Sequence, residues 1–340
     1  MKKDINNDEN NVTSFISRRE FLTGISKASA VFPLIQSLSL LGGKVNAKEN
    51  ISKSRIVIIR KENATSDYKI NREVVQRMFD ESLMTLTGKN STNESWGVIL
   101  PKINLSKDRI SLKVNCISNH VVSHKEVSFA IVNSLVKFGV PDNNIIIWDR
   151  FEREIERAGY VINTSDKGVR CFGTDHPGIG YSEKLFKIPE GIETSLSRIM
   201  TDYTDYLINV PLLKNHVDAG ITICLKNHFG SFKNHNRFHN VDLNNVIPQI
   251  NAVPEIKDKC VLNVVDALFG VAYGGPGGPP TFTYNGLILG FDPVAIDYQG
   301  MKILESYKCP TIDIAKYVIP ASTKYKLGNY DPKMIEIIEV

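Results

Sequence analysis

Cysteine is scarce in this chain and is never clustered. The 340 residues include five cysteines that lie far apart in the sequence: Cys116, Cys171, Cys224, Cys260 and Cys309. None forms a Cys-x-x-Cys pair, the spacing typical of zinc ribbons and iron–sulfur sites. The spacing therefore argues against a chain-encoded centre of either kind. An odd number also leaves at least one thiol unpaired within a monomer in an oxidising compartment.

An excess of one charge is also lacking. The formal net charge is +4 at pH 7, and the sequence contains no long block of like charge, no heptad run and no repeat of fixed period. The first 47 residues hold six basic and four acidic side chains, so +2 of the +4 lies there and +2 remains for residues 48–340. A nearly neutral chain argues against nucleic acid as a partner.

A nucleotide-binding P-loop is missing as well. The glycine-rich segment Tyr273–Pro280 does not end in Gly-Lys-Ser/Thr and opens no helix. Two interpretations of this segment stay open: a backbone wall beside a ligand, or a stiff structural loop. Shortly after it, Asn285-Gly286 predicts the turn of a β-hairpin.

Long apolar runs are absent. The stretch Ala28–Leu41 has fourteen residues, too few to span a bilayer comfortably. It follows the basic segment Ser17–Leu22, which contains adjacent arginines, and it ends near the small residues Val45–Ala47. This layout resembles a cleavable twin-arginine signal peptide over residues 1–47, with a permanent anchor as the alternative.

The resemblance to a twin-arginine signal has consequences for location and partners. It implies that the twin-arginine translocase exports the chain already folded, to the periplasm or another extracytoplasmic space. We then expect no stable membrane span, and we expect a cofactor to be bound before export. The remaining 293 residues, 48–340, suffice for one large α/β domain or for two lobes with a boundary near residues 174–205.

Hydrophobic periodicity over residues 110–148 predicts a β-α-β unit. Ile110–Val114 and Ile145–Trp148 have the composition of buried strands. Between them, Ser123-x-x-Glu126 has the pattern of a capping box, and Gly139 is a typical helix end. The apolar face of that helix is predicted to contain four residues: Phe129, Val132, Leu135 and Val136. A right-handed crossover of this kind favours an α/β fold with a mainly parallel sheet and flanking helices.

Further elements are predicted on both sides of this unit. Three more segments are predicted to be strands: Arg55–Arg60, Tyr206–Pro211 and Cys260–Val265. The segment Asn71–Leu83 is predicted to be an amphipathic helix. Asp292 followed by Pro293 predicts the start of another helix. Within that helix, Asp297 faces either the site or solvent.

The segment from Lys214 to His239 is the leading candidate site. Its twenty-six residues contain four of the seven histidines of the chain, three lysines and one arginine. The segment follows the predicted strand Tyr206–Pro211, and ligands of α/β proteins are held beyond the carboxyl ends of strands. For any single one of these residues, a solvated surface position is an equal alternative.

Lys226 and three histidines carry the predicted chemistry of this segment. The small apolar residues Ala219–Leu225 are expected to place Lys226 against packed structure, where a desolvated amine becomes a nucleophile or an anchor. His216 is the candidate catalytic histidine, and His216, His235 and His239 are candidate metal ligands. Their spacing matches no standard zinc signature.

Polar residues also follow the neighbouring predicted strands. Lys113 and Asn115 lie at the end of Ile110–Val114, Arg150 follows Ile145–Trp148, and Asp266 follows Cys260–Val265. The substrate-binding candidates are Lys113, Asn115, Arg150, Lys214, Asn227 and Asp266. For Asp149 and Arg150, a helix cap with its partner is an equal alternative.

Three stretches together resemble the family known as domain of unknown function 362. They are Lys113–Asn115 with the following helix, Ile208–Gly230, and Val264–Asp297. The resemblance covers most of residues 108–305. Members of that family usually carry proline where this chain has Val114. Some members also carry ferredoxin-like cysteine clusters, which this chain lacks.

The segment His216–Lys226 is similar, position for position, to one in the nickel-pincer lactate racemase family. There the lysine tethers an organometallic cofactor, and histidines serve as metal ligand and as acid or base. The resemblance implies that Lys226 anchors a cofactor, that His216 is a base or ligand, and that His239 or His235 binds nickel. Of that family's Gly-x-His-Arg loop, this chain keeps only Arg150.

Two hypotheses of function follow. The first is an exported enzyme, an oxidoreductase or isomerase, that uses a transition metal such as nickel or iron, or an organometallic cofactor. It acts on a small hydroxy- or carboxylate-bearing molecule, whose anionic groups Lys113, Lys214 and Arg150 hold while His216 exchanges protons near neutral pH. The second is a non-catalytic protein that binds a metal or ligand or assembles a cofactor. A role as an iron–sulfur or electron-transfer partner protein is suggested only by the other members of the 362 family.

Overall fold

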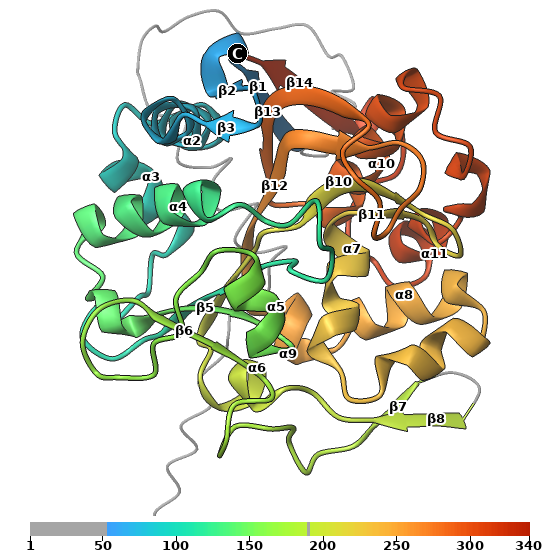
Figure 1. Cartoon of the computed structure of the whole chain (residues 1–340), viewed down its shortest axis with the longest axis horizontal. Coiled ribbons are helices and arrows are strands. Elements are labelled where there is room, and N and C mark those ends of the chain that lie inside the picture. The colour runs from blue at the N-terminus through green and yellow to red at the C-terminus, as the bar shows by residue number, and fades with distance from the viewer. Residues whose placement is uncertain (1–52, 189–190) are drawn as a thin grey trace, which may run out of the picture. The chain divides into compact units, whose positions relative to one another are not determined.

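The computed structural model describes residues 53–188 and 191–340 (Figure 1). The predicted signal peptide, residues 1–47, lies outside the described residues. Within the described ranges, no helix has both the length and the apolar character needed to cross a bilayer. Residues Lys53–Val340 group into one unit by their internal contacts. The segment 174–205, considered above as a lobe boundary, lies within this unit.

A ten-stranded sheet forms the centre of the fold. Its main path runs in the order β14-β1-β13-β12-β9-β4-β5-β6, and β10 joins it by pairing with both β12 and β11. The strands are β1 (Ser54–Arg60), β4 (Ile110–Lys113), β5 (Ile145–Asp149), β6 (Arg170–Gly173), β9 (Tyr206–Asn209), β10 (Leu212–His216), β11 (Gly220–Thr222), β12 (Cys260–Val271), β13 (Phe282–Gly290) and β14 (Ile335–Glu339).

Most neighbouring strands in this sheet are parallel. Six pairs are parallel: β5–β6, β4–β5, β4–β9, β9–β12, β10–β12 and β1–β14. Three pairs are antiparallel: β1–β13, β12–β13 and β10–β11. The predicted α/β class with a mainly parallel sheet and flanking helices is confirmed.

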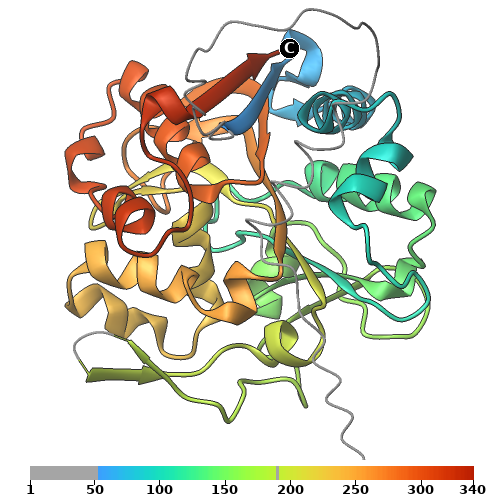
Figure 2. The same cartoon turned by 180° about the vertical axis from the view of Figure 1, so that it is seen from behind.

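Helices cover both faces of the sheet (Figures 1 and 2). They are α2 (Arg72–Thr87), α3 (Thr92–Ile99), α4 (Lys125–Phe138), α5 (Glu152–Arg157), α6 (Arg198–Asp202), α7 (Cys224–Asn227), α8 (Leu243–Asn251), α9 (Pro254–Lys257), α10 (Pro293–Ser306) and α11 (Val318–Thr323). Two short hairpins lie outside the main sheet: β2 (Thr65–Ser66) with β3 (Lys69–Ile70), and β7 (Phe186–Ile188) with β8 (Ile192–Thr194).

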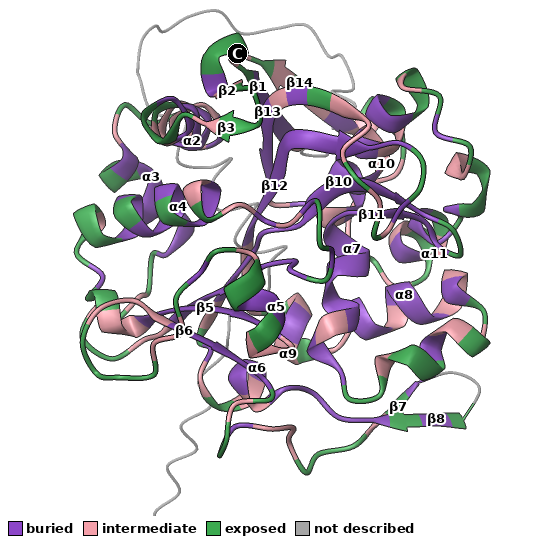
Figure 3. Cartoon of the chain, viewed as in Figure 1, coloured by how far each residue is buried: buried purple, intermediate pink, exposed green. Residues whose placement is uncertain are grey.

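Alternation along the strands divides the interior into two cores. In β1, Val57 and Ile59 pack with α2, α3 and α4, whereas Ile56 and Ile58 pack with α8, α10 and α11. Successive side chains of a strand point to opposite faces, so a fully apolar strand requires a cover on both sides. Figure 3 shows the central strands buried along their length.

The predicted β-α-β unit is present as β4, α4 and β5, but its helix begins differently. The capping box is wrong: the N-cap residue is His124, without a side-chain cap bond, and the Ser123 hydroxyl instead donates to the Val210 carbonyl and accepts from the Asn115 N–H. The predicted apolar face is also shifted. Phe129 and Val136 are exposed, because the buried face of α4 is centred on Ile131 and neighbouring residues.

The region after β12 differs from the sequence prediction. The strand continues to Val271, so Asp266 lies in its middle and not at its exit. Asn285, with φ of 54°, forms a bulge within β13 where the β12–β13 register shifts, so the predicted hairpin turn is wrong. The connection between the two strands is the Gly/Pro-rich loop. The predicted helix start is confirmed, since the Asp292 carboxylate accepts from the first backbone N–H groups of α10.

Candidate functional site

A cavity of about 290 Å³ lies beyond the carboxyl ends of β4 and β5, beside the β10–β11 hairpin and α7. In register, Lys113 of β4 pairs with Trp148 of β5 and with Asn209 of β9, so these strand ends are level. Nine of the predicted site residues line the cavity: Lys113, Asn115, Arg150, Lys214, His216, Lys226, Asn227, His235 and His239. The cavity is at the small end of the range for ligand pockets.

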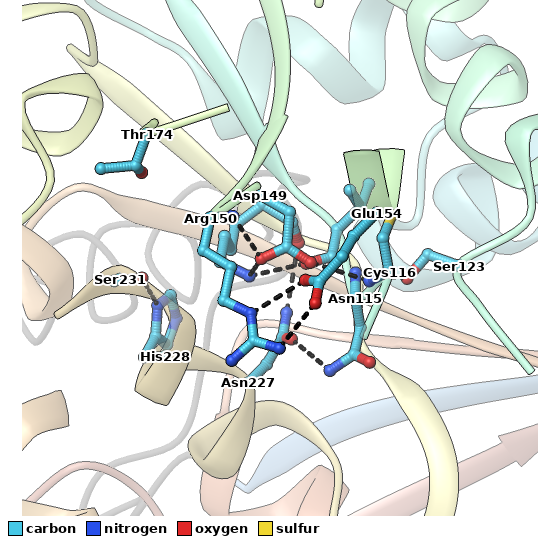
Figure 4. A network of polar contacts seen from close by, with 12 residues as sticks. Asn115, Cys116, Ser123, Asp149, Arg150, Glu154, Thr174, Asn227, His228 and Ser231 are labelled. Atoms are coloured by element: carbon cyan, nitrogen blue, oxygen red, sulfur yellow. Dashed lines mark hydrogen bonds and ion pairs between the residues drawn. The ribbon is translucent and has the colours of Figure 1, made fainter. Parts of the chain in front are cut away.

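Lys113 is neutralised at the floor of the cavity. Its ammonium lies 2.8 Å from Asp149 Oδ1 and donates to the Val114 carbonyl, and both side chains of the ion pair are buried. The second oxygen of Asp149 accepts from the Cys116 N–H at 2.7 Å (Figure 4). Asp149 therefore fixes the loop after β4 and balances the lysine charge. It does not cap the following helix, because the N-cap residue of α5 is Phe151, which has no side-chain cap bond.

Arg150 is also paired. Two of its nitrogens donate to the Glu154 carboxylate at 2.8 Å, in an arrangement visible in Figure 4. A third, Nη1, lies 2.6 Å from His235 Nε2, so this imidazole nitrogen must accept the hydrogen bond. Burial and the Arg150 charge lower the pKa of His235 to about 4. Arg150 thus occupies one of the two ring nitrogens through which His235 could bind a metal.

The β10–β11 hairpin presents three polar side chains to the cavity. Lys214 and His216 are two residues apart on β10 and share one face, and Thr222 of β11 is the cross-strand partner of Lys214. Lys214 donates to Asn115 Oδ1 at 3.0 Å, and burial lowers its pKa to about 8. Thr222 was not among the predicted site residues, yet its buried hydroxyl has no hydrogen-bond partner within the described ranges.

A chain of buried amides supports Lys214. Asn115 Nδ2 donates to Asn227 Oδ1, Asn227 Nδ2 donates to Asn209 Oδ1, and Asn209 Nδ2 donates to Asn263 Oδ1. Each amide is thereby fixed in orientation, because its oxygen and its nitrogen are used by different neighbours. Asn227, which also donates to the Lys113 carbonyl, therefore positions the other side chains although it lines the cavity.

Lys226 lies on α7, a helix of four residues that is held by a distant carboxylate. Asp297 of α10 accepts from the N–H groups of Cys224 and Leu225, so it faces neither solvent nor the cavity. Lys226 Nζ lies 3.2 Å from the centroid of the Phe229 ring and has no hydrogen bond or ion pair to any described residue. Burial, with the charges of Lys214 and Arg150, holds the pKa of Lys226 well below its ordinary value.

His216 and His239 meet at the mouth of the cavity. Their rings stack with centroids 5.3 Å apart, and His239 Nδ1 lies 3.3 Å from Asp218 Oδ2. One ligand atom from each of His216, Asp218 and His239 lies within 4.8 Å of the others. Asp218 was missed by the sequence reasoning, although its position two residues after His216 in a tight hairpin turn was a usable signal.

The surroundings of His216 fix its tautomer. Its Nδ1 atom accepts from the backbone N–H groups of Asp218 and Ala219, so the proton of the neutral ring is on Nε2. Burial and the charge of Lys226 lower the pKa of His216 to about 3. In this setting the ring is neutral at physiological pH and is suited to donate a hydrogen bond.

One predicted site residue, Asp266, and the fourth histidine of the segment, His228, lie away from the cavity. Asp266, predicted to bind substrate, is fully buried within β12 and accepts from both the backbone and the ring of His124 at 2.7 Å. That prediction is wrong because β12 continues past Asp266 and turns its carboxylate toward α4. His228 is buried against Ser231 and does not line the cavity.

The Gly/Pro-rich loop after β12 forms part of the cavity wall through Pro276. Gly275 donates its N–H to Asn215 Oδ1 at 2.8 Å, and a Cβ atom at Gly275 would lie 2.3 Å from that oxygen. Glycine is therefore required where this loop approaches β10. Both interpretations of the loop apply, because it is anchored to the sheet and also borders the cavity.

The charges around the cavity leave an excess of positive sites. Lys113 and Arg150 have carboxylate partners in Asp149 and Glu154. Lys214 and Lys226 have none within 4 Å among the described residues. The remaining acid of the lining, Asp218, is 55% exposed at the mouth. The cavity therefore favours an anion.

The family comparison adds to this geometry. The model of the family described as "Domain of unknown function (DUF362)" matches residues 110–302, more than half of the chain. The chain belongs to the DUF362 family. The match agrees with the range of about 108–305 expected from the three resembling stretches. Every cavity-lining residue of this DUF362 protein named above lies within the matched range.

The other comparisons are less informative. None of the curated proteins matches the chain. A crystal structure of a Thermotoga maritima protein, from a structural genomics consortium, is similar with a TM-score of 0.39 and 12% sequence identity. The similarity covers 72% of this chain and 59% of the other, so the chain spans less than two thirds of that protein.

Proposed function

We propose that this DUF362 protein is an exported enzyme that acts on a small anionic molecule held in the cavity. The observation that carries the proposal is the pair of buried lysines, Lys214 and Lys226, which line one cavity without a carboxylate partner among the described residues. Burying an ammonium group costs free energy unless a counter-charge is present. A bound anion would supply the counter-charge that the described protein residues do not provide. Perturbed titratable groups in a cleft support a site of chemistry.

The residues suggest a division of roles. Lys226 and Lys214 hold the anionic group of the substrate. Beside them, Thr222 offers a hydroxyl that has no hydrogen-bond partner among the residues the structure describes. His216, neutral with its proton on Nε2, donates a hydrogen bond to a carbonyl or hydroxyl oxygen of the substrate. This assignment replaces the expectation that His216 exchanges protons near neutral pH. Such an arrangement suits redox or isomerisation chemistry at a carbon next to that oxygen.

As an alternative to this role of His216, we propose that His216, Asp218 and His239 form the metal site, in place of the predicted set with His235. One ring nitrogen of His216 would then bind the metal, so His216 would give up either its Nε2 proton or the hydrogen bonds that Nδ1 accepts from the Asp218 and Ala219 N–H groups. The buried His239 Nδ1 atom has no hydrogen-bond partner among the described residues, and it is close to the Asp218 carboxylate. The mixed nitrogen and oxygen donor set suits a divalent transition metal such as nickel or iron. A bound metal would polarise a substrate oxygen. Lys226 would be the anchoring amine if the cofactor is organometallic.

Binding measurements test the anion site. Titration calorimetry with acetate, lactate and inorganic phosphate should show binding to the wild-type protein. Lys226→Met removes a charged hydrogen bond worth about 1.5–3 kcal/mol, so affinity should fall about 10- to 150-fold. Lys233→Met is the matched control, because Lys233 is exposed and does not line the cavity. Equal affinity in both variants would refute the anion site.

Elemental analysis tests the metal site. Protein purified from its own host should contain about one metal ion per chain, and Asp218→Asn should lose it whereas His235→Ala should keep it. The reverse result would restore His235 as the ligand. Stoichiometric binding without turnover of any bound hydroxy acid would favour the second candidate function, a non-catalytic binding or cofactor-assembly protein.

Export by the twin-arginine route remains part of the proposal. Intact-mass spectrometry of the secreted or periplasmic protein should show cleavage near residue 47. Replacing both Arg18 and Arg19 by lysine should retain the precursor in the cytoplasm. Unimpaired export of that variant would refute the route.

A further inference from the structure

The mouth of the cavity carries exposed apolar side chains. Ile117 is 41% exposed and Val217 is 56% exposed, and both line the cavity. They come from different elements, the loop after β4 and the turn between β10 and β11. Single exposed hydrophobic residues are ordinary on protein surfaces, but two facing one cavity from separate elements are a feature of that cavity.

The loop that carries Ile117 is held in place. Arg157 Nη2 donates to the carbonyls of Cys116 and Ile117 at 3.1 Å, and Asp149 accepts from the Cys116 N–H. Ser118 Oγ donates to the Gly277 carbonyl, which ties this loop to the Gly/Pro-rich loop. The exposure of Ile117 is therefore maintained by polar contacts of its own backbone.

Val217 is fixed in the same way. It lies between His216 and Asp218, and the Asp218 N–H donates to His216 Nδ1 across it. The tight turn leaves the Val217 side chain outside the hairpin. Pro276, from the Gly/Pro-rich loop, adds a third apolar surface to the cavity wall.

The cavity thus has two zones of different chemistry. Lys214 and Lys226 lie buried in its depth, whereas Ile117 and Val217 lie at its entrance. A ligand that is only a small inorganic anion would satisfy the lysines and leave the apolar entrance in water. A ligand with an apolar substituent would cover both zones.

We propose that the substrate is a carboxylate with an apolar substituent, whose anionic end meets Lys214 and Lys226 and whose hydrocarbon part covers Ile117 and Val217. This inference rests on the proposed anion site and specifies its substrate class. It makes Ile117 and Val217 specificity-determining residues that take no part in the reaction.

A chain-length series tests the inference. Calorimetry with acetate, propanoate, butanoate and hexanoate should show affinity for the wild-type protein rising about threefold to fourfold per added methylene. In the double variant Ile117→Ser/Val217→Ser this gain should shrink to less than twofold per methylene, with acetate affinity unchanged. Ile319→Ser is the matched control: Ile319 is 43% exposed on α11 and does not line the cavity, so the gain should persist.

The outcomes separate the two proposals. Equal affinity for every carboxylate overturns the apolar entrance and leaves the anion site standing. Absence of binding by any carboxylate refutes the anion site itself. A double variant that keeps the full chain-length gain, or that changes only the oligomeric state in size-exclusion chromatography, assigns Ile117 and Val217 to another role and overturns the inference.

Discussion

Asp297 offers a sharp test of how the site is held. Its carboxylate is fully buried and accepts from the Cys224 N–H at 2.7 Å, the Leu225 N–H at 3.2 Å and the Tyr317 hydroxyl at 3.1 Å. Despite these bonds, burial raises the pKa of Asp297 to about 7. In the unfolded chain the carboxyl group has its ordinary pKa of 3.8. The folded state therefore binds a proton between about pH 4 and pH 7 that the unfolded state has released.

The sign of the effect follows from this difference. The free energy of unfolding decreases with pH wherever the folded state binds more protons, so Asp297 lowers stability progressively from about pH 4 to about pH 7. A shift of about three pKa units corresponds to roughly 4 kcal/mol. Asp297→Asn keeps an acceptor for the first N–H of α7 and cannot ionise. The difference in stability between wild type and variant should therefore change by a few kcal/mol over this range, in favour of the variant at higher pH.

Urea unfolding of both proteins at pH 4.5, 6 and 8 measures this difference, and contributions of other acids cancel in it. Tyr317→Phe is a second probe: it removes a hydrogen bond that lowers the pKa of Asp297, so the decline in stability should extend to higher pH. Parallel stability curves for wild type and Asp297→Asn would refute the reasoning, because the buried carboxyl would then titrate like an unfolded one.

Three further outcomes are expected. Asp149→Asn leaves the Lys113 ammonium buried without its counter-charge and should lower the free energy of unfolding by about 3–5 kcal/mol in urea, a loss that Lys113→Met in the same chain should partly restore. Burial lowers the pKa of Lys214 to about 8, and an anion binds its charged form, so carboxylate affinity should fall up to tenfold per pH unit above about pH 8; a flat profile would contradict this. Gly275→Ala places a methyl group against Asn215, which should displace the cavity wall and weaken carboxylate binding. Calorimetry with acetate measures this effect, and unchanged acetate affinity would contradict the prediction.

Local patterns predicted much of the fold. Apolar runs gave β4, β5 and β9, and the Asp292-Pro293 pair gave the start of α10, because strands and helix caps depend on neighbouring residues. Predictions failed where a residue distant in the sequence takes the hydrogen bond that the local pattern predicts. Ser123 has the capping pattern, but Val210 and Asn115 take its hydroxyl group.

The candidate site shows the same division. The density of lysine and histidine after one strand was enough to locate the cavity, since polar residues at strand ends converge in an α/β sheet. The pairing among them was not predictable. Arg150 engages one ring nitrogen of His235, while Asp218 lies beside His216 because the hairpin turns tightly there.

The sequence by itself determined several of the strands and helices, that Lys226 is desolvated, and that basic residues gather in one region of the fold. Only the tertiary structure decided which charges are already balanced. Lys113 of β4 finds its carboxylate in Asp149 of β5, and Arg150 finds Glu154 four residues on, whereas Lys214 and Lys226 find none among the described residues. The physical reason is that burial and secondary structure depend largely on neighbouring residues in the sequence. Whether a buried charge meets a counter-charge depends on how segments far apart in the sequence pack against each other.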